Sequence, residues 1–290
     1  MHLRTPAIYH SNNIRDILKH CTYNTWVILD LDNTVFKSIQ DLGSDQWYTR
    51  FFEYAIAQIT SDKTEAFTLV IAVYDAVQQH VSQKPVEPGI VEIIRRLQDI
   101  GIPVLGLTAR SSRISDRTLQ QLQENGIDFS RFWGKSHFKL AQDGNYTPVF
   151  HDGVIFCNSL NKGKCLKSFS DRTGLYPRAV VMADDKEKNL HAVHAAQDET
   201  GGSFVGIRYG RLDNEVAALD LRNATIELTR ISHLLPEEAR AAIAKLKITA
   251  ILSFPGSGSL LASKSLFSHN EKVPRQDGHE NEHESVLTYY

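Results

Sequence analysis

Trp26-Val27-Ile28-Leu29-Asp30-Leu31-Asp32-Asn33-Thr34 is an apolar run that ends in two aspartates. A short apolar run bounded by polar residues predicts a buried strand. In an open α/β sheet, ligands bind at the carboxyl ends of the strands. Two carboxylates this close repel each other unless a cation or a shared proton relieves them. The stretch therefore predicts a bound metal, with one carboxylate available as a nucleophile.

The composition is that of a soluble globular protein, with 42% hydrophobic and 23% charged residues in a chain of 290. The net charge of −2 gives no field that would attract nucleic acid. Three cysteines are too few, and odd in number, for a disulfide framework. No apolar stretch approaches the roughly 20 residues of a membrane helix, and residues 1–20 lack a signal-peptide core. We therefore expect a protein of the reducing cytoplasm.

Apolar segments with the character of strands alternate with segments of helical periodicity. Strands are expected at about 26–31, 103–107, 179–183 and 203–208, with a hairpin or flap within 128–158. This alternation predicts an α/β fold with a doubly wound parallel sheet and crossover helices on both faces. Two helices are expected within residues 40–84. We expect a core over 1–213, a helical region over 214–250 and a poorly ordered tail over 251–290.

Four features with chemical potential follow one another, each near a strand end or a helix start. They are Asp30 with Asp32, Thr108, a lysine at position 162 or 164, and Asp184 with Asp185. Phosphoryl transfer needs a nucleophile, positioning and charge neutralisation, and this set supplies all three.

Each feature has an expected role. Asp30 would attack phosphorus, and Asp32 would protonate the leaving oxygen and then deprotonate water. Mg²⁺ would be held by Asp30 and Asp184, with a backbone carbonyl near Asp32 as a further ligand. Thr108 would donate to the phosphate, and Asp185 would orient metal-bound water.

The remaining role, a positive charge against the phosphoryl group, falls to Lys162, with Lys164 as the rival. Arg110 and Arg113 are predicted to be solvated or salt-bridged rather than bound to phosphate. The aromatic side chains around Trp47 are expected to serve packing more than substrate contact.

The ordered set resembles the haloacid dehalogenase (HAD) superfamily of phosphotransferases. Its D-x-D-x-[TV] motif is matched by Asp30, Asp32 and Thr34, and its later motifs by Thr108, Lys162 and the pair Asp184-Asp185. The resemblance implies a HAD-like core over about 22–210, and residues 40–84 then take the place of a helical cap. Because dehalogenases and ATPases of the superfamily lack the second aspartate, Asp32 implies a phosphohydrolase.

A closer resemblance concerns the stretches Leu29–Phe36, Leu42–Trp47 and Asp184–Leu190. These are similar to a HAD-like family of Legionella and related intracellular bacteria, which includes an effector that is a protein-tyrosine phosphatase. The acidic tail residues Glu280, Glu282 and Glu284 are similar to type IV secretion signals. The resemblance implies a phosphotyrosine protein as substrate and delivery into a host cell.

Two alternatives stay open at this point. One is a phosphatase of small metabolites. The other is a binding module, in which the helices within 214–250 dock onto a membrane surface or a host partner.

Overall fold

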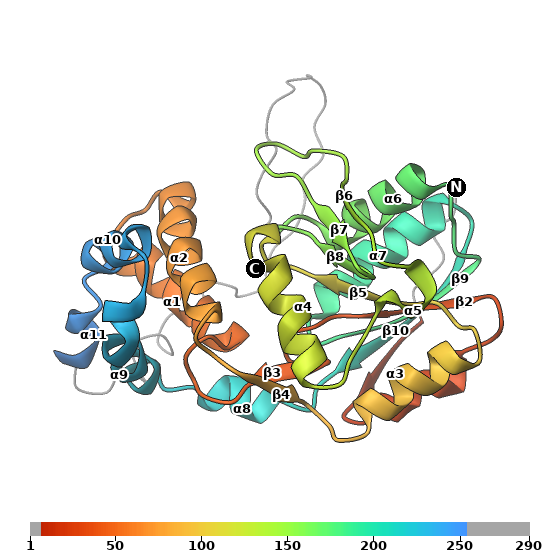
Figure 1. Cartoon of the computed structure of the whole chain (residues 1–290), viewed down its shortest axis with the longest axis horizontal. Helices are drawn as coiled ribbons and strands as arrows, with labels where there is room; N and C mark the ends of the chain where they lie inside the picture. The colour runs from red at the N-terminus through yellow and green to blue at the C-terminus, as the bar shows by residue number, and fades with distance from the viewer. Residues whose placement is uncertain (1–6, 254–290) are drawn as a thin grey trace, which may run out of the picture.

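An eight-stranded sheet forms the centre of the computed structural model, which describes residues 7–253 (Figure 1). Its strand order is β1 (Ala7–Ser11), β10 (Ser203–Tyr209), β9 (Ala179–Asp184), β2 (Thr25–Leu29), β5 (Val104–Thr108), β8 (Val154–Phe156), β7 (Val149–His151) and β6 (His137–Lys139). The neighbours from β1 to β8 are parallel, whereas β7 and β6 are antiparallel. The expected α/β fold is therefore confirmed, and the sheet, expected to be parallel, is mostly parallel with an antiparallel end formed by β7 and β6.

Strand β2 is buried on both faces because successive side chains of a strand point in opposite directions. Val27 and Leu29 pack into one apolar cluster with the helices η1 (Ile14–His20), α3 (Ile90–Asp99) and α4 (Ser115–Glu124). Trp26 and Ile28 pack into the opposite cluster with α6 (Lys162–Thr173) and α7 (Glu187–Glu199). The strand is thus held from both sides, and its carboxyl end lies in the middle of one sheet edge.

The chain leaves this edge after β2 and forms a helical excursion. It passes through β3 (Phe36–Ser38), α1 (Asp45–Gln58) and α2 (Lys63–Gln78), and returns through β4 (Gln83–Pro85), which pairs antiparallel with β3. Ser44 and Asp62 start the two helices, since each side chain accepts a backbone N–H of the first turn. The two helices expected within residues 40–84 are present.

The C-terminal helices pack onto this excursion. After β10, α8 (Asp213–Ala218) leads to α9 (Leu221–Ile231), η3 (Ser232–Leu234), α10 (Glu237–Leu246) and α11 (Thr249–Ser253). Apolar residues of α1, α2, α9, α10 and α11 form one cluster, at the left of Figure 1. We call these five helices the helical lobe. Two segments far apart in sequence therefore build one unit beside the sheet.

The segment 128–158 contains α5 (Ser130–Trp133) and the expected hairpin, which is β6–β7. The next strand, β8, returns to the parallel part of the sheet beside β5. Most of the tail expected over 251–290 lies outside the described residues. Over residues 7–253, no helix has both the length and the apolar character needed to cross a bilayer.

Candidate functional site

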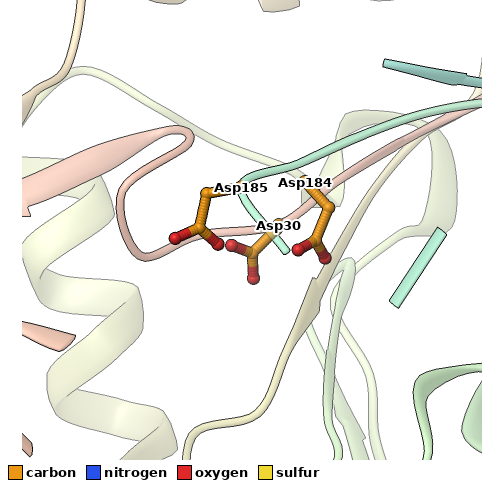
Figure 2. Close-up of side chains that lie close together, drawn as sticks. All are labelled: Asp30, Asp184 and Asp185. Carbon is orange, nitrogen blue, oxygen red and sulfur yellow. The ribbon is translucent and has the colours of Figure 1, made fainter. Parts of the chain in front are cut away.

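Three carboxylates meet where β2 and β9 end (Figure 2). Asp30 follows β2, Asp184 is the last residue of β9, and Asp185 is the next residue. The two strands are hydrogen-bonded neighbours, and the Asp30 N–H donates to the carbonyl of Ala183 at 3.0 Å. One carboxylate oxygen from each aspartate lies within 4.8 Å of the others. The sheet thus joins side chains that are about 150 residues apart in the chain.

Lys162 bridges two of these carboxylates from the first turn of α6. Its Nζ donates to Asp30 Oδ1 at 2.6 Å and to Asp184 Oδ2 at 2.7 Å, and the side chain is only 3% exposed. Lys164 points elsewhere: it is 71% exposed and pairs with Asp143. Of the two candidate lysines, the structure brings Lys162 to the acidic cluster.

The electrostatics of the cluster are dominated by burial. Burial raises the pKa of Asp30 well above its usual value, against the attraction of Lys162, and burial raises the pKa of Asp185 to about 7. Burial alone would lower the pKa of Lys162, but Asp184 and Asp30 more than offset this and raise it. A bound cation would favour the ionised form of these carboxylates, and the three side chains offer only oxygen atoms as donors. Oxygen donors are the ligands that hard cations take, so these three aspartates could hold a metal ion.

Polar neighbours fix the orientation of the carboxylates. Asp184 accepts the backbone N–H of Lys186 at 2.8 Å and the side-chain amide of Asn189 at 2.9 Å. Thr34 Oγ1 donates to Asp30 Oδ2 at 3.2 Å. No role was predicted for Asn189, although its place in the first turn of α7, directly after Asp184-Asp185, is a sequence signal for a residue that contacts this pair.

Asp32 does not join the acidic cluster. Its carboxylate accepts two parallel hydrogen bonds from Arg110, Nε to Oδ2 at 2.9 Å and Nη2 to Oδ1 at 2.8 Å. The carboxylate of Asp32 is bound to Arg110, so it is not placed to bind a metal held by the acidic cluster. That the backbone carbonyl of Asp32 binds the metal stays a prediction. The third carboxylate of the acidic cluster, beside those of Asp30 and Asp184, is that of Asp185.

The sequence did not predict how completely Arg110 is enclosed. It is salt-bridged, as expected, but it is also fully enclosed, with a side chain 1% exposed. It donates to Gln121 Oε1 at 2.7 Å and to Thr118 Oγ1 at 3.1 Å, and its guanidinium lies 4.7 Å from the ring centre of Phe36. Every side of Arg110 is thus engaged, and Arg110 holds the Asp32 side chain in one orientation.

Thr108 ends β5, the strand beside β2, and is buried. Its hydroxyl accepts the backbone N–H of Arg110 at 3.1 Å. Thr108 therefore lies at the same sheet edge as Asp30, as predicted from its place after an apolar run.

The helical lobe contacts the edge of the site. Lys186, the residue after Asp185, forms an ion pair of 3.0 Å with Asp45 at the start of α1. From α4, Arg117 donates to the backbone carbonyls of Gln78 and Val81. These bonds hold the excursion against the strand ends that carry the acidic residues.

A family model described as "Protein of unknown function (DUF2608)" matches residues 7–241. A Chlamydia trachomatis protein named "Putative outer membrane protein" is 25% identical over 186 residues, which cover 64% of this chain and 69% of that protein. A Chlamydia muridarum protein of the same name is 26% identical over 67% of this chain and 72% of that protein. An uncharacterized Rickettsia prowazekii protein is 25% identical over 72% and 80% of the two lengths.

These comparisons correct the expected family. The chain was expected to belong to the haloacid dehalogenase superfamily, closest to a HAD-like family of Legionella, and this is wrong: the matching family model is a different one, and the relatives carry no such name. Short motifs around strand ends reflect local chemistry, so they are weaker evidence of family than a match over most of the chain.

Proposed function

The chain belongs to the DUF2608 family, whose description assigns no activity, and we propose that it is a Mg²⁺-dependent phosphatase of phosphomonoesters. One observation carries the proposal: buried Lys162 bridges Asp30 and Asp184 at the ends of β2 and β9, with Asp185 beside them. This geometry, and not the family, supports the proposed function.

Asp30 is the proposed nucleophile. Its Oδ1 accepts from Lys162 and its Oδ2 from Thr34, so the carboxylate is held in a fixed direction. Its oxygen would bond to phosphorus as the bond to the leaving alcohol breaks, and water would then hydrolyse the resulting aspartyl-phosphate. Lys162 would place its positive charge beside the transferred group.

Asp30, Asp184 and Asp185 would hold the divalent cation. When bound, Mg²⁺ supplies charge neutralisation for the phosphoryl oxygens. Asn189 and the backbone N–H of Lys186 would keep Asp184 turned toward the cation. Thr108 would donate from its hydroxyl to a phosphate oxygen.

Asp32 is the proposed acid and base. It follows the nucleophile by two residues and lies at the same sheet edge, where it could reach the leaving oxygen and the incoming water. Arg110 would aim the Asp32 side chain, because two parallel hydrogen bonds fix the plane of a carboxylate.

The test uses p-nitrophenyl phosphate with Mg²⁺. Asp30→Asn should reduce turnover to the background rate, and Asp32→Asn should reduce it about 10²- to 10⁴-fold, the usual effect of removing a general acid or base. Asp143→Asn, which breaks only the exposed pair with Lys164, is the matched control and should keep wild-type turnover. Wild-type turnover in both site variants would refute the proposal.

The substrate beyond a phosphomonoester stays a prediction, with a phosphotyrosine protein and small metabolites as the two classes. A panel of phosphopeptides and small phosphoesters at equal protein and Mg²⁺ concentrations separates them. Docking through residues 214–250 also stays a prediction, although the apolar residues of α9 and α10 already pack against α1 and α2.

The proposed location is the cytoplasm of the producing cell, with delivery to a host cell through a type IV system. The tail residues on which delivery rests lie outside the described part of the chain. Cell fractionation and a translocation assay with and without residues 251–290 would test both points. Recovery of the protein only in an outer-membrane fraction, the location in the relatives' names, would refute the first.

A further inference from the structure

A cavity of about 340 Å³ lies between the helical lobe and the sheet edge that carries the site. One wall is a single face of α2, with Phe67, Ile71 and Asp75 at helical spacing. The opposite wall is the β6–β7 hairpin with Tyr146, and the floor is formed by the loops that follow β5 and β8. The volume is within the range of small-molecule sites.

The cavity is close to the proposed phosphoryl site. Its floor loops follow β5 and β8, and β2, β5 and β8 are successive parallel neighbours in the sheet. Since neighbouring strands lie about 4.8 Å apart, the ends of β2 and β8 are roughly 10 Å apart. The cavity is therefore within reach of the alcohol group of a phosphomonoester whose phosphorus lies at Asp30.

The floor is held in one shape by Asn158. Its Oδ1 accepts the backbone N–H of Ser112 at 2.6 Å, and its Nδ2 donates to the carbonyl of Thr147 at 2.7 Å. Asn158 and Ser159 both have positive φ, 52° and 62°, a left-handed conformation that is uncommon for residues other than glycine and asparagine. The cavity is therefore pre-formed.

Asp75 is the unusual group in the cavity wall. It is 6% exposed, and neither carboxylate oxygen makes a hydrogen bond of good geometry among residues 7–253, although the side chain of Ser111 is near enough to lower the pKa of Asp75 against the larger effect of burial. The nearest cationic group is Arg113, whose Nε is 3.9 Å from Oδ2, beyond hydrogen-bond reach. A buried carboxylate without a donor is unfavourable, so a ligand that supplies a donor is favoured there.

The surroundings of Asp75 favour a cationic donor. Arg113 is also paired with Glu238 at 3.2 Å, so its charge is balanced, and Lys139 is an exposed residue whose charge water screens. The rings of Phe67 and Tyr146 meet nearly at right angles with centroids 5.8 Å apart, and aromatic faces attract ammonium groups. The inner part of the cavity thus combines an acceptor, apolar walls and aromatic rings.

We propose that this cavity binds the alcohol part of the substrate, and that this part is an apolar, aromatic-sized group that carries an amine which pairs with Asp75. The proposal rests on the proposed phosphatase function for its link to catalysis, whereas the binding of the amine does not depend on turnover. Asp75 and Tyr146 are then specificity-determining residues.

The direct test is a binding experiment with the full chain. Tyramine and 4-ethylphenol differ only in the amine, so calorimetric titration of both probes isolates its contribution. The wild type should bind tyramine about tenfold more tightly, the effect expected of one charge-assisted hydrogen bond. Asp75→Asn should bind the two probes equally, whereas Asp116→Asn, whose side chain is 96% exposed, should keep the preference.

A second variant, Tyr146→Leu, tests the proposal even if Asp75→Asn does not fold. Tyr146 is half-buried in the loop between β6 and β7, so Tyr146→Leu should fold normally and bind tyramine about threefold less tightly through loss of the ring. Equal wild-type affinity for both probes, or no binding of either, would overturn the proposal. A preference for tyramine that persists in Asp75→Asn would overturn the role of Asp75.

Turnover of the phosphorylated probes separates the two proposals. With Mg²⁺, tyramine phosphate should have a lower KM than 4-ethylphenyl phosphate at similar kcat, and Asp75→Asn should abolish the difference. Failure to hydrolyse 4-ethylphenyl phosphate would refute the phosphatase function. The binding experiment would still show whether the cavity binds the amine through Asp75. Hydrolysis of both esters with equal KM in the wild type would overturn the cavity proposal alone.

Discussion

Replacement of Lys162 by methionine tests the centre of the site in the absence of any substrate. Methionine keeps most of the length and apolar stem of lysine but removes the ammonium. Asp30 and Asp184 would then face each other, buried and without the cation that holds them at 2.6 and 2.7 Å. The expected result is a large loss of stability in metal-free protein.

The magnitude follows from burial. Removal of one partner from a buried, hydrogen-bonded ion pair costs about 3–5 kcal/mol, because the remaining charge is left uncompensated. For a domain of this size, each kcal/mol lowers Tm by about 2–4 °C, so the decrease in Tm should be roughly 6–20 °C. An exposed lysine contributes far less, so Lys164→Met should change the free energy of unfolding by less than about 0.5 kcal/mol.

The assay is thermal unfolding by far-ultraviolet circular dichroism, in EDTA and then with excess Mg²⁺. If the acidic residues bind the cation, Mg²⁺ should stabilise the folded protein, by about 2.7 kcal/mol at a concentration 100 times Kd. Because Lys162→Met removes the positive charge that competes with the cation for Asp30 and Asp184, the variant should gain more stability from Mg²⁺ than the wild type, and the difference between their Tm values should decrease. Tm values of the Lys162 and Lys164 variants within about 2 °C of each other in EDTA would refute the reasoning.

Three further predictions concern other parts of the structure. Gly163→Ala should lower the free energy of unfolding by more than about 2 kcal/mol in urea titration, because a Cβ would meet the carbonyl oxygen of Ala192 at 2.0 Å; an unchanged midpoint would contradict this contact. Arg110→Lys should lower stability by about 1–3 kcal/mol and also turnover, because lysine cannot make the two parallel bonds to Asp32; wild-type stability and rate would be the contrary result. Burial raises the pKa of Asp75 from 3.8 to about 6, so its contribution to stability is present below pH 4 and is lost as pH rises through 6. Between pH 4 and pH 7, the free energy of unfolding of Asp75→Asn should therefore rise by up to about 3 kcal/mol relative to that of the wild type, measured from urea unfolding curves of both proteins. If the free energies of unfolding of the two proteins depend on pH in the same way, this titration of Asp75 is excluded.

Several parts of the fold could be predicted from local patterns. The strands near residues 26, 104 and 179 are apolar runs bounded by polar residues, and such runs are buried wherever they pack. The same apolar runs predict that Asp30, Thr108 and Asp184 lie at the carboxyl ends of these strands. Strand β1 was missed because the five-residue edge strand Ala7–Ser11 is only half-buried and carries no such run.

The motifs predicted which residues lie close together better than they predicted the family. The acidic residues and the lysine do come together, as their order in the chain suggested. The family assignment drawn from the same residues was wrong.

What the amino-acid sequence by itself determined was therefore the main buried strands, the longer helices and the polar residues at their ends, because periodicity and capping act over a few residues. Only the tertiary structure decided the partners: Lys162 rather than Lys164 reaches Asp30, and Arg110 binds Asp32 across 78 positions of the chain. The tertiary structure also joined α9 and α10 to α1 and α2. Such choices depend on which surfaces become buried together, and the free energy of burial arises only when distant segments meet.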